Sequence, residues 1–128
     1  MKRNGFTFVE LLVVMTIAGI IFAISTVTYT NVTKSSRDAR RKADMESIRQ
    51  ALELCRSFQG FYPDEVAGTP AHVPDPLICG SQTYMTSVPK DPKSTTTHYT
   101  YDRVTTTTYT LSSSLMESQL NPYTVTNP

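Results

Sequence analysis

The sequence contains few of the residue patterns on which catalytic and metal sites depend. It has two cysteines and two histidines among 128 residues, and it lacks glycine-rich phosphate loops, paired-carboxylate motifs and nucleophile elbows. Neither His72 nor His98 has a cysteine or an acid at the spacing of a metal ligand or a catalytic triad. We therefore expect no enzymatic activity, no cofactor and no metal site.

A strong net charge is also missing, although the charge is unevenly distributed. The formal net charge is +1. Residues 1–42 hold seven bases and two acids, whereas residues 43–128 hold five bases and nine acids. The acidic balance of the second part argues against a nucleic-acid-binding surface that covers it, because such surfaces are basic. A local DNA-binding patch stays open, but no residue pattern supports it.

One long apolar run stands out. Residues 6–25, FTFVELLVVMTIAGIIFAIS, follow a short basic leader of residues 1–5 and carry a single acid, Glu10. A helix of this length covers roughly 30 Å, the thickness of a bilayer's hydrocarbon layer. The only stretch that can be removed as a leader lies before the run rather than after it, unlike in a secretory signal. We therefore expect the apolar helix to stay with the mature protein and to span a membrane.

Glu10 needs a partner of opposite charge in such a helix. A charged side chain inside a bilayer costs on the order of 2.5–3.5 kcal/mol. A buried carboxylate is stable when a cation lies within a few ångströms. The alternative is an ordinary signal anchor that carries one isolated acid.

The residues KRNG followed by FTFVELLVVMTIAGIIFAI resemble the N-terminal signature of the type IV pilin family, which includes the pseudopilins of type II secretion. The resemblance implies that a prepilin peptidase cleaves the chain after Gly5 and N-methylates the new first residue, Phe6. It also implies that Glu10 pairs with the N-terminal ammonium of a neighbouring subunit during filament assembly. This role agrees with the need of Glu10 for a cation.

Gly19 lies where many pilins begin a stretch that loses helical structure inside the filament. Glycine costs about 1 kcal/mol relative to alanine in a helix, and residues 25–30 contain few strong helix formers. The proline that closes this stretch in many pilins is replaced by Val27 here. Gly19 is thus a candidate for local melting, on a weaker pattern than in those relatives.

Residues 29–59 show the pattern of an amphipathic helix that ends at Gln59-Gly60. The three-and-four spacing predicts one half-buried face. Its members are Met45, Ile48, Ala51, Leu52, Cys55 and Phe58.

Charged residues cover the rest of this helix. Those from Arg37 to Glu46 are expected to lie mostly in water, with contact to neighbouring subunits as the alternative. We expect ion pairs on the helix surface, each worth roughly a few tenths of a kcal/mol. The pairs are Asp38 with Arg41 or Lys42, and Glu46 with Arg49.

The two cysteines, Cys55 and Cys79, are separated by a loop-like segment. Residues 57–63, SFQGFYP, resemble the segment that closes the long helix in pseudopilins. Those relatives commonly have a tyrosine in place of Cys55, and the departure suggests an added cross-link. Outside the membrane an oxidised pair is the expected state, and it would stabilise the fold by roughly 3.5 kcal/mol in the chain-entropy model. Two free thiols are the alternative.

Prolines and glycines interrupt residues 60–96 too often for a long helix or a central strand, so we expect connecting loops there. Residues 88–92, VPKDP, resemble a segment of the major pseudopilins, whose next region often binds calcium through an acidic loop. Beyond Asp102 the only acid here is Glu117. Because calcium needs several oxygen ligands, usually including carboxylates, we expect no calcium site.

Residues 97–128 read as an antiparallel sheet with a tail. Segments 98–102 and 106–112 are rich in β-branched and aromatic residues, and their alternation places Tyr99 with Tyr101 and Tyr109 with Leu111. We expect a turn at residues 102–105 and a further short strand at residues 123–126. These faces are too small to fold alone and need the amphipathic helix beneath them.

The predicted fold class is α+β: a long N-terminal helix packed against a small C-terminal antiparallel sheet, the fold of pilins. The expected parts are a leader (1–5), a membrane or filament-core half of the helix (6–28), its amphipathic half (29–59), connecting loops (60–96), and the sheet with its tail (97–128).

The resemblance implies a structural subunit of a helical type IV pilus-like filament made of identical subunits. Its other partners would be membrane lipid before assembly, the prepilin peptidase, and an inner-membrane assembly platform with its ATPase. The chain would lie first in the cytoplasmic membrane, with its N-terminus inside, and later in an extracellular filament. A secretion-system pseudopilin and a membrane-anchored binding module that does not polymerise are the alternatives.

Overall fold

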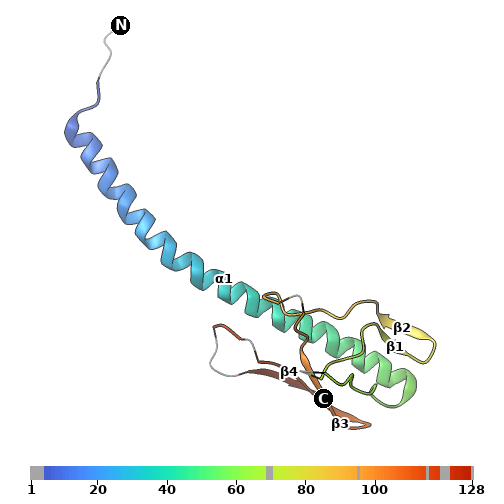
Figure 1. Ribbon diagram of the computed structural model, residues 1–128. Coiled ribbons are helices and arrows are strands. Elements are labelled where there is room, and N and C mark those ends of the chain that lie inside the picture. Colours follow the sequence, from blue (N-terminus) through green and yellow to red (C-terminus); the bar gives the residue numbers. More distant parts are fainter. Residues whose placement is uncertain (1–4, 69–70, 95, 115, 119–121, 128) are drawn as a thin grey trace. The chain divides into compact units, whose positions relative to one another are not determined.

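The computed structural model describes the chain except residues 1–4, 69–70, 95, 115, 119–121 and 128. The chain forms two compact units, residues 1–34 and 35–128, which we call the N-terminal and the C-terminal unit. Helix α1 (Phe8–Gln59) begins in the first unit and ends in the second, and the strands of the described residues lie in the second (Figure 1). This layout, one long helix followed by small antiparallel sheets, confirms the predicted α+β fold class.

Helix α1 begins where Thr7 caps it. The side-chain Oγ1 of Thr7 accepts a hydrogen bond from the backbone N–H of Glu10 at 3.3 Å, which is the arrangement of a helix N-cap. The helix therefore starts at Phe8, two residues later than the sequence indicated. The residues from Gly5 to Ser25 are all exposed, and the helix is long and apolar enough to cross a membrane.

The other end of α1 is set by a glycine. Gly60 has a φ of +85°, and its backbone N–H donates to the carbonyl oxygen of Arg56 at 2.7 Å. Residues with side chains rarely adopt this left-handed conformation, which glycine adopts readily. The helix therefore ends at Gln59, as the sequence predicted.

The predicted apolar face of α1 forms one side of the core, with one exception. Met45, Ile48, Leu52 and Cys55 are fully buried, and Ala51 is buried as well. They join residues of the strands and loops in one core cluster, which also contains Tyr62, Val73, Leu77, Cys79, Val88, Tyr99, Tyr101, Tyr109 and Leu111.

The exception is Phe58, which was expected on the buried face but is 60 % exposed. Its ring lies against Gly80 instead: a Cβ added to Gly80 would lie 3.0 Å from Phe58 Cε1. Phe58 therefore packs on the turn after β1 and not in the core.

A disulfide joins α1 to strand β1 (Leu77–Cys79). Cys55 and Cys79 are bonded, with their Cα atoms 5.7 Å apart, and both are buried. The structure thus has the pairing that the sequence favoured over two free thiols.

The expectation of connecting loops alone over residues 60–96 is wrong. Strand β1 pairs with β2 (Gln82–Met85) in an antiparallel two-stranded sheet. Pro76 lies directly before β1 and the next proline is Pro89, so residues 77–85 contain no proline. Gly80 supplies the turn with a φ of +62°. Two strands this short leave too few residues for a detectable alternation pattern.

The second sheet has the order β3-β4-β5 and is antiparallel throughout. Its strands are β3 (Thr100–Thr105), β4 (Thr108–Ser113) and β5 (Tyr123–Thr126). The strand predicted at residues 123–126 is confirmed, and so are the two pairs of buried residues, Tyr99 with Tyr101 and Tyr109 with Leu111.

The predicted turn at residues 102–105 is wrong, because β3 continues to Thr105 and the turn lies at Thr106 and Thr107. The register shifts between Asp102 and Thr105. No Asn-Gly or Asp-Gly pair marks the hairpin in the sequence, so a run of threonines gave no signal for where the strand ends.

Candidate functional site

The residues expected to take part in cleavage, methylation and pairing lie at the start of α1. Gly5 and Phe6 form an irregular segment before the helix, and Phe6 is 78 % exposed. Glu10 is exposed in the first helical turn, where the helix dipole favours a negative charge. The Gly5–Phe6 bond is thus accessible to a peptidase, and the Glu10 carboxylate is accessible to a partner of opposite charge. Cleavage, methylation and pairing themselves stay predictions.

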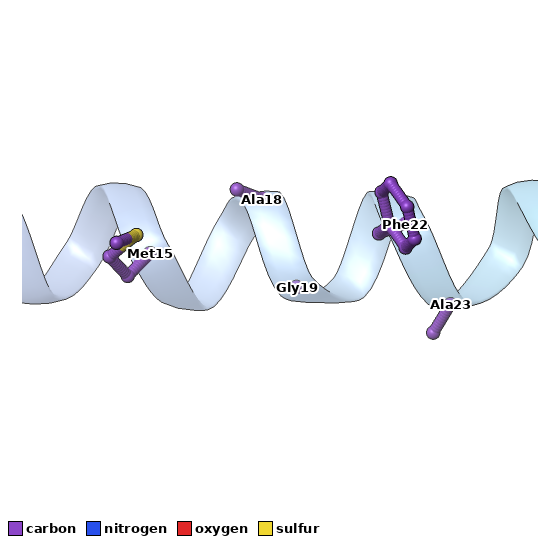
Figure 2. A pocket seen from close by; sticks show the side chains of 5 residues that line it. All are labelled: Met15, Ala18, Gly19, Phe22 and Ala23. Carbon is purple, nitrogen blue, oxygen red and sulfur yellow. The ribbon is translucent and has the colours of Figure 1, made fainter.

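Gly19 lies within the continuous helix α1. A shallow hollow on the helix surface is lined by Met15, Ala18, Gly19, Phe22 and Ala23, and Figure 2 shows that Gly19 presents no side chain there. A Cβ added to Gly19 would meet no atom within 4 Å, so packing within the chain does not require the glycine. The melting expected at Gly19 concerns an assembled filament and stays a prediction.

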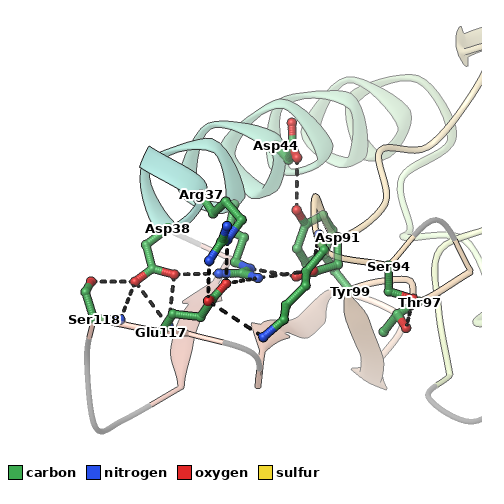
Figure 3. Close-up of polar contacts among 11 residues, drawn as sticks. Arg37, Asp38, Asp44, Asp91, Ser94, Thr97, Tyr99, Glu117 and Ser118 are labelled. Carbon is green, nitrogen blue, oxygen red and sulfur yellow. Dashed lines mark hydrogen bonds and ion pairs between the residues drawn. The ribbon is translucent and has the colours of Figure 1, made fainter. Parts of the chain in front are cut away.

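The C-terminal unit contains a cluster of charges (Figure 3), which we call the ion-pair cluster: Arg37, Asp38, Arg41, Asp91 and Glu117. Asp38, Arg41 and Asp91 are buried, and Arg37 and Glu117 are partly exposed. Arg41 is its central residue and is fully buried. Its Nε lies 2.6 Å from Asp91 Oδ2, its Nη1 2.6 Å from Asp38 Oδ1, and its Nη2 3.2 Å from Glu117 Oε1. Arg37 donates two more hydrogen bonds to Glu117, at 2.7 and 2.6 Å.

The carboxylates of the cluster hold two loops on α1. Asp38 accepts hydrogen bonds from the backbone N–H groups of Glu117 at 3.0 Å and Ser118 at 2.7 Å, and from the Ser118 hydroxyl. Asp91 Oδ1 accepts from the backbone N–H of Lys93 at 2.8 Å. The cluster therefore fastens the segment around Glu117 and the turn around Asp91 to the same part of the helix.

These contacts keep the cluster charged at neutral pH. Hydrogen bonds from Arg37 lower the pKa of Glu117 to about 2. Burial by itself would raise the pKa values of Asp38 and Asp91, but the hydrogen bonds that the two carboxylates accept outweigh it and lower both pKa values. The hydrogen bond to Asp91, together with those to the other carboxylates, raises the pKa of Arg41.

The solvated charged face expected from Arg37 to Glu46 is therefore wrong for Asp38 and Arg41. The pair that they form at i and i+3 was predicted, but as a weak surface pair, whereas Asp38 is 3 % and Arg41 0 % exposed. Their partners, Asp91 and Glu117, lie far along the chain, and helix periodicity contains no information about them. The acid of VPKDP was visible in the sequence, but only as part of a loop. The predicted pair of Glu46 with Arg49 is present at 2.6 Å on the partly exposed surface.

The two histidines come together in the fold. The rings of His72 and His98 stack with their centroids 4.2 Å apart and an interplanar angle of 12°. Isolated β-bridges hold both segments, Val66 with His72 and Lys90 with His98. Burial, followed by the charges of His72 and Lys90, lowers the pKa of His98. Over the part of the chain that the structure describes, no group of three His, Cys, Asp or Glu side chains is placed to hold a metal ion.

One comparison with known proteins gives a match. Residues 1–26 match the family model of the prokaryotic N-terminal methylation motif. No curated protein and no solved structure matches the chain. The matched residues include Gly5, Phe6, Glu10 and Gly19, and none of them lies in the C-terminal unit.

Proposed function

Since the chain begins with the N-terminal methylation motif of type IV pilin and pseudopilin precursors, we propose that it is the structural subunit of a type IV pilus-like filament. In this proposal a prepilin peptidase removes residues 1–5 by cleaving after Gly5 and then methylates Phe6. The mature chains leave the membrane and assemble through the first part of α1. The role is structural and not catalytic.

The exposed apolar surface of the N-terminal unit is the observation that carries this proposal. Phe8 is 78 % exposed, Met15 67 % and Phe22 76 %. A large apolar side chain gains about 1.5–3 kcal/mol when it is removed from water. The helix therefore needs an apolar environment, which lipid supplies before assembly and the helices of other copies supply in a filament.

Glu10 gives a reason why such helices would meet in one register. It is the only acid in the apolar run, and an unpaired carboxylate among apolar helices is strongly disfavoured. Cleavage after Gly5 creates an ammonium group on Phe6, four residues before Glu10 in the sequence. The ammonium of one copy can then neutralise the Glu10 carboxylate of the next.

The C-terminal unit can stay folded both in the membrane-anchored chain and in the filament, because contacts within the unit itself stabilise it. It has its own core cluster, the ion-pair cluster and the Cys55–Cys79 disulfide. An outward-facing domain of this kind can stay folded while the helix before it moves from lipid into a filament. In this proposal the leader end of the precursor lies in the cytoplasm and the C-terminal unit lies outside it. An inner-membrane assembly platform and its ATPase are the further partners.

Replacing Glu10 tests the proposal. We expect Glu10→Ala to leave membrane insertion and leader removal intact, because neither needs the pairing, and to reduce shear-released filaments at least tenfold. Glu46→Ala is the matched control, since Glu46 is an acid of the same helix outside the apolar run, and it should leave filament yield unchanged. Normal filaments from the Glu10→Ala chain would refute the assembly role.

A further inference from the structure

The C-terminal unit presents a positively charged hollow beside the ion-pair cluster. This basic cleft has a volume of about 460 Å³ and is lined by Arg40 of α1 and by residues 87–92. Arg40 and Lys90 are both exposed. Within the described residues, neither of them forms an ion pair with an acid.

Asp91 also lines the cleft, but it does not cancel this charge. Its carboxylate lies 2.6 Å from the guanidinium of Arg41, which is fully buried. Among the described residues, Asp91 belongs to a network in which three cations, Arg37, Arg41 and Lys93, pair with three acids, Asp38, Asp91 and Glu117. The positive charges of Arg40 and Lys90 remain available to an acidic partner.

A second surface has the opposite charge. Asp64 and Glu65 lie beside strand β3, where Asp64 pairs with the guanidinium of Arg103 and Glu65 Oε2 accepts a hydrogen bond from the backbone N–H of Arg103 at 3.0 Å. Asp102 is the preceding residue of the strand and is exposed. These three acids outnumber their one base by two, and we call this surface the acidic edge.

We propose that the basic cleft of one copy binds the acidic edge of the next copy in the filament. The two surfaces are opposite in charge, because Arg40 and Lys90 of the cleft pair with no acid among the described residues, whereas the edge has an excess of two acids over its one base. The proposal rests on the filament function above and identifies the contact between the C-terminal units.

Repeating this contact from copy to copy would produce a polymer, with no other contact between the C-terminal units needed. The cleft and the edge are different surfaces of one unit, so a copy that uses its cleft still has a free edge. A head-to-tail contact of this kind produces open helical assemblies when the rotation does not close a ring. It would therefore act together with the packing of the apolar helices.

The cleft is held rigid before any partner arrives. Arg40 is next to Arg41 in α1, and the opposite wall is fixed by Asp91 and by the hydrogen bond from the Val88 N–H to Asp75 Oδ1 at 3.0 Å. A preorganised surface loses less freedom on binding. Exposed ion pairs are individually weak, so this contact would contribute mainly once the anchored helices bring the copies together.

Charge reversal in the full-length chain tests the contact. The cleft variant combines Arg40→Glu with Lys90→Glu, and the edge variant combines Asp64→Lys with Asp102→Lys. We expect each variant to release at least tenfold fewer filaments on shearing. The chain that carries all four changes should recover at least half of the normal yield, because the charges then match again.

A control and a folding assay accompany these variants. The variant Lys34→Glu with Lys42→Glu has the same change in net charge as the cleft variant but lies outside both surfaces, and it should assemble normally. Protection of Cys55 and Cys79 from thiol labelling in membranes shows that each variant has folded and oxidised.

The outcomes separate the two proposals. If the unchanged chain forms no filaments at all, the proposed filament function is wrong, and the proposed contact between cleft and edge is then wrong as well. If the unchanged chain assembles and folded cleft and edge variants do so equally well, only the contact is wrong. Loss in both variants without recovery in the combined chain would also overturn it, since the cleft would then bind a different anionic partner.

Discussion

The two units of the chain differ in where their apolar side chains lie. In the N-terminal unit the described apolar residues are exposed, from Phe6 to Val32. In the C-terminal unit fourteen of the described apolar residues are buried and form a core, although Phe58 and Phe61 stay exposed, and the ion-pair cluster and the disulfide reinforce it. The second unit therefore carries the determinants of its own fold, whereas the described apolar side chains of the first are not buried by the chain itself.

Removing the central cation of the ion-pair cluster should have the largest effect on the C-terminal unit. Arg41→Ala leaves Asp38 and Asp91 buried without their main counter-ion, and breaking a buried ion pair in this way costs about 3–5 kcal/mol. Arg40→Ala, at the exposed neighbouring position, should change the free energy of unfolding by less than about 0.5 kcal/mol. Equal losses in the two variants would show that the cluster does not have the burial described.

Urea unfolding of the full-length protein in detergent, followed by tyrosine fluorescence, measures this difference. The chain has seven tyrosines and no tryptophan, and of these tyrosines only Tyr29 lies in the N-terminal unit. The signal therefore reports the C-terminal unit.

Two identical changes, one in each unit, test the comparison itself. Leu52 is fully buried and Leu12 is 52 % exposed. Leu52→Ala should lower the free energy of unfolding of the C-terminal unit by about 3 kcal/mol, through lost burial and a cavity, and Leu12→Ala should leave it unchanged. A clear loss for Leu12→Ala in the same urea titration would mean that the N-terminal unit contributes to the fold of the other.

A matched pair of tyrosines gives a smaller effect. The Tyr101 hydroxyl donates to the carbonyl oxygen of Pro63 at 2.9 Å, whereas the buried Tyr109 hydroxyl has no hydrogen-bond partner among the described residues. Tyr101→Phe should cost about 1 kcal/mol, and Tyr109→Phe should be neutral or slightly stabilising. Thermal unfolding followed by circular dichroism measures the stability of both variants. A larger loss of stability for Tyr109→Phe than for Tyr101→Phe would contradict this prediction.

The smallest expected effect is a pH dependence of the C-terminal unit. The pKa of His98 is lowered from 6.5 by burial and by the charges of His72 and Lys90, against the opposing charge of Asp75. Since the unfolded chain then binds a proton more readily, stability is complete above pH 6.5 and falls as the pH drops toward the lower folded pKa. Urea midpoints measured between pH 7 and pH 5 should decrease slightly, and His98→Gln should weaken the decrease.

Features encoded over short distances could be predicted from the sequence. The apolar run, the amphipathic face from Met45 to Cys55 and the end of α1 at Gly60 follow from spacing within one helix. The sequence also predicted the fold class, the disulfide partners and the strand at residues 123–126. Each of these depends on a local pattern, or on the presence of a single pair of cysteines.

The features that were missed depend on partners far apart in the sequence. Arg41 is buried because Asp91 and Glu117 approach it from two separate loops, and no helix pattern contains that information. The hairpin of β1 and β2 is too short for alternation, and the threonines around residue 106 do not mark where β3 turns. Thr7 could have been recognised as the N-cap, because Thr-x-x-Glu at residues 7–10 is the pattern of a capping box.

The first residue of the extracellular form decides whether Phe6 has a free amine that can pair with Glu10. Mass spectrometry of the chain released from cells by shearing should find a first residue of N-methylated phenylalanine, Phe6, with residues 1–5 absent. A sheared extracellular chain that still begins at Met1 would have no ammonium group at Phe6 to pair with Glu10, and the assembly described here would be wrong.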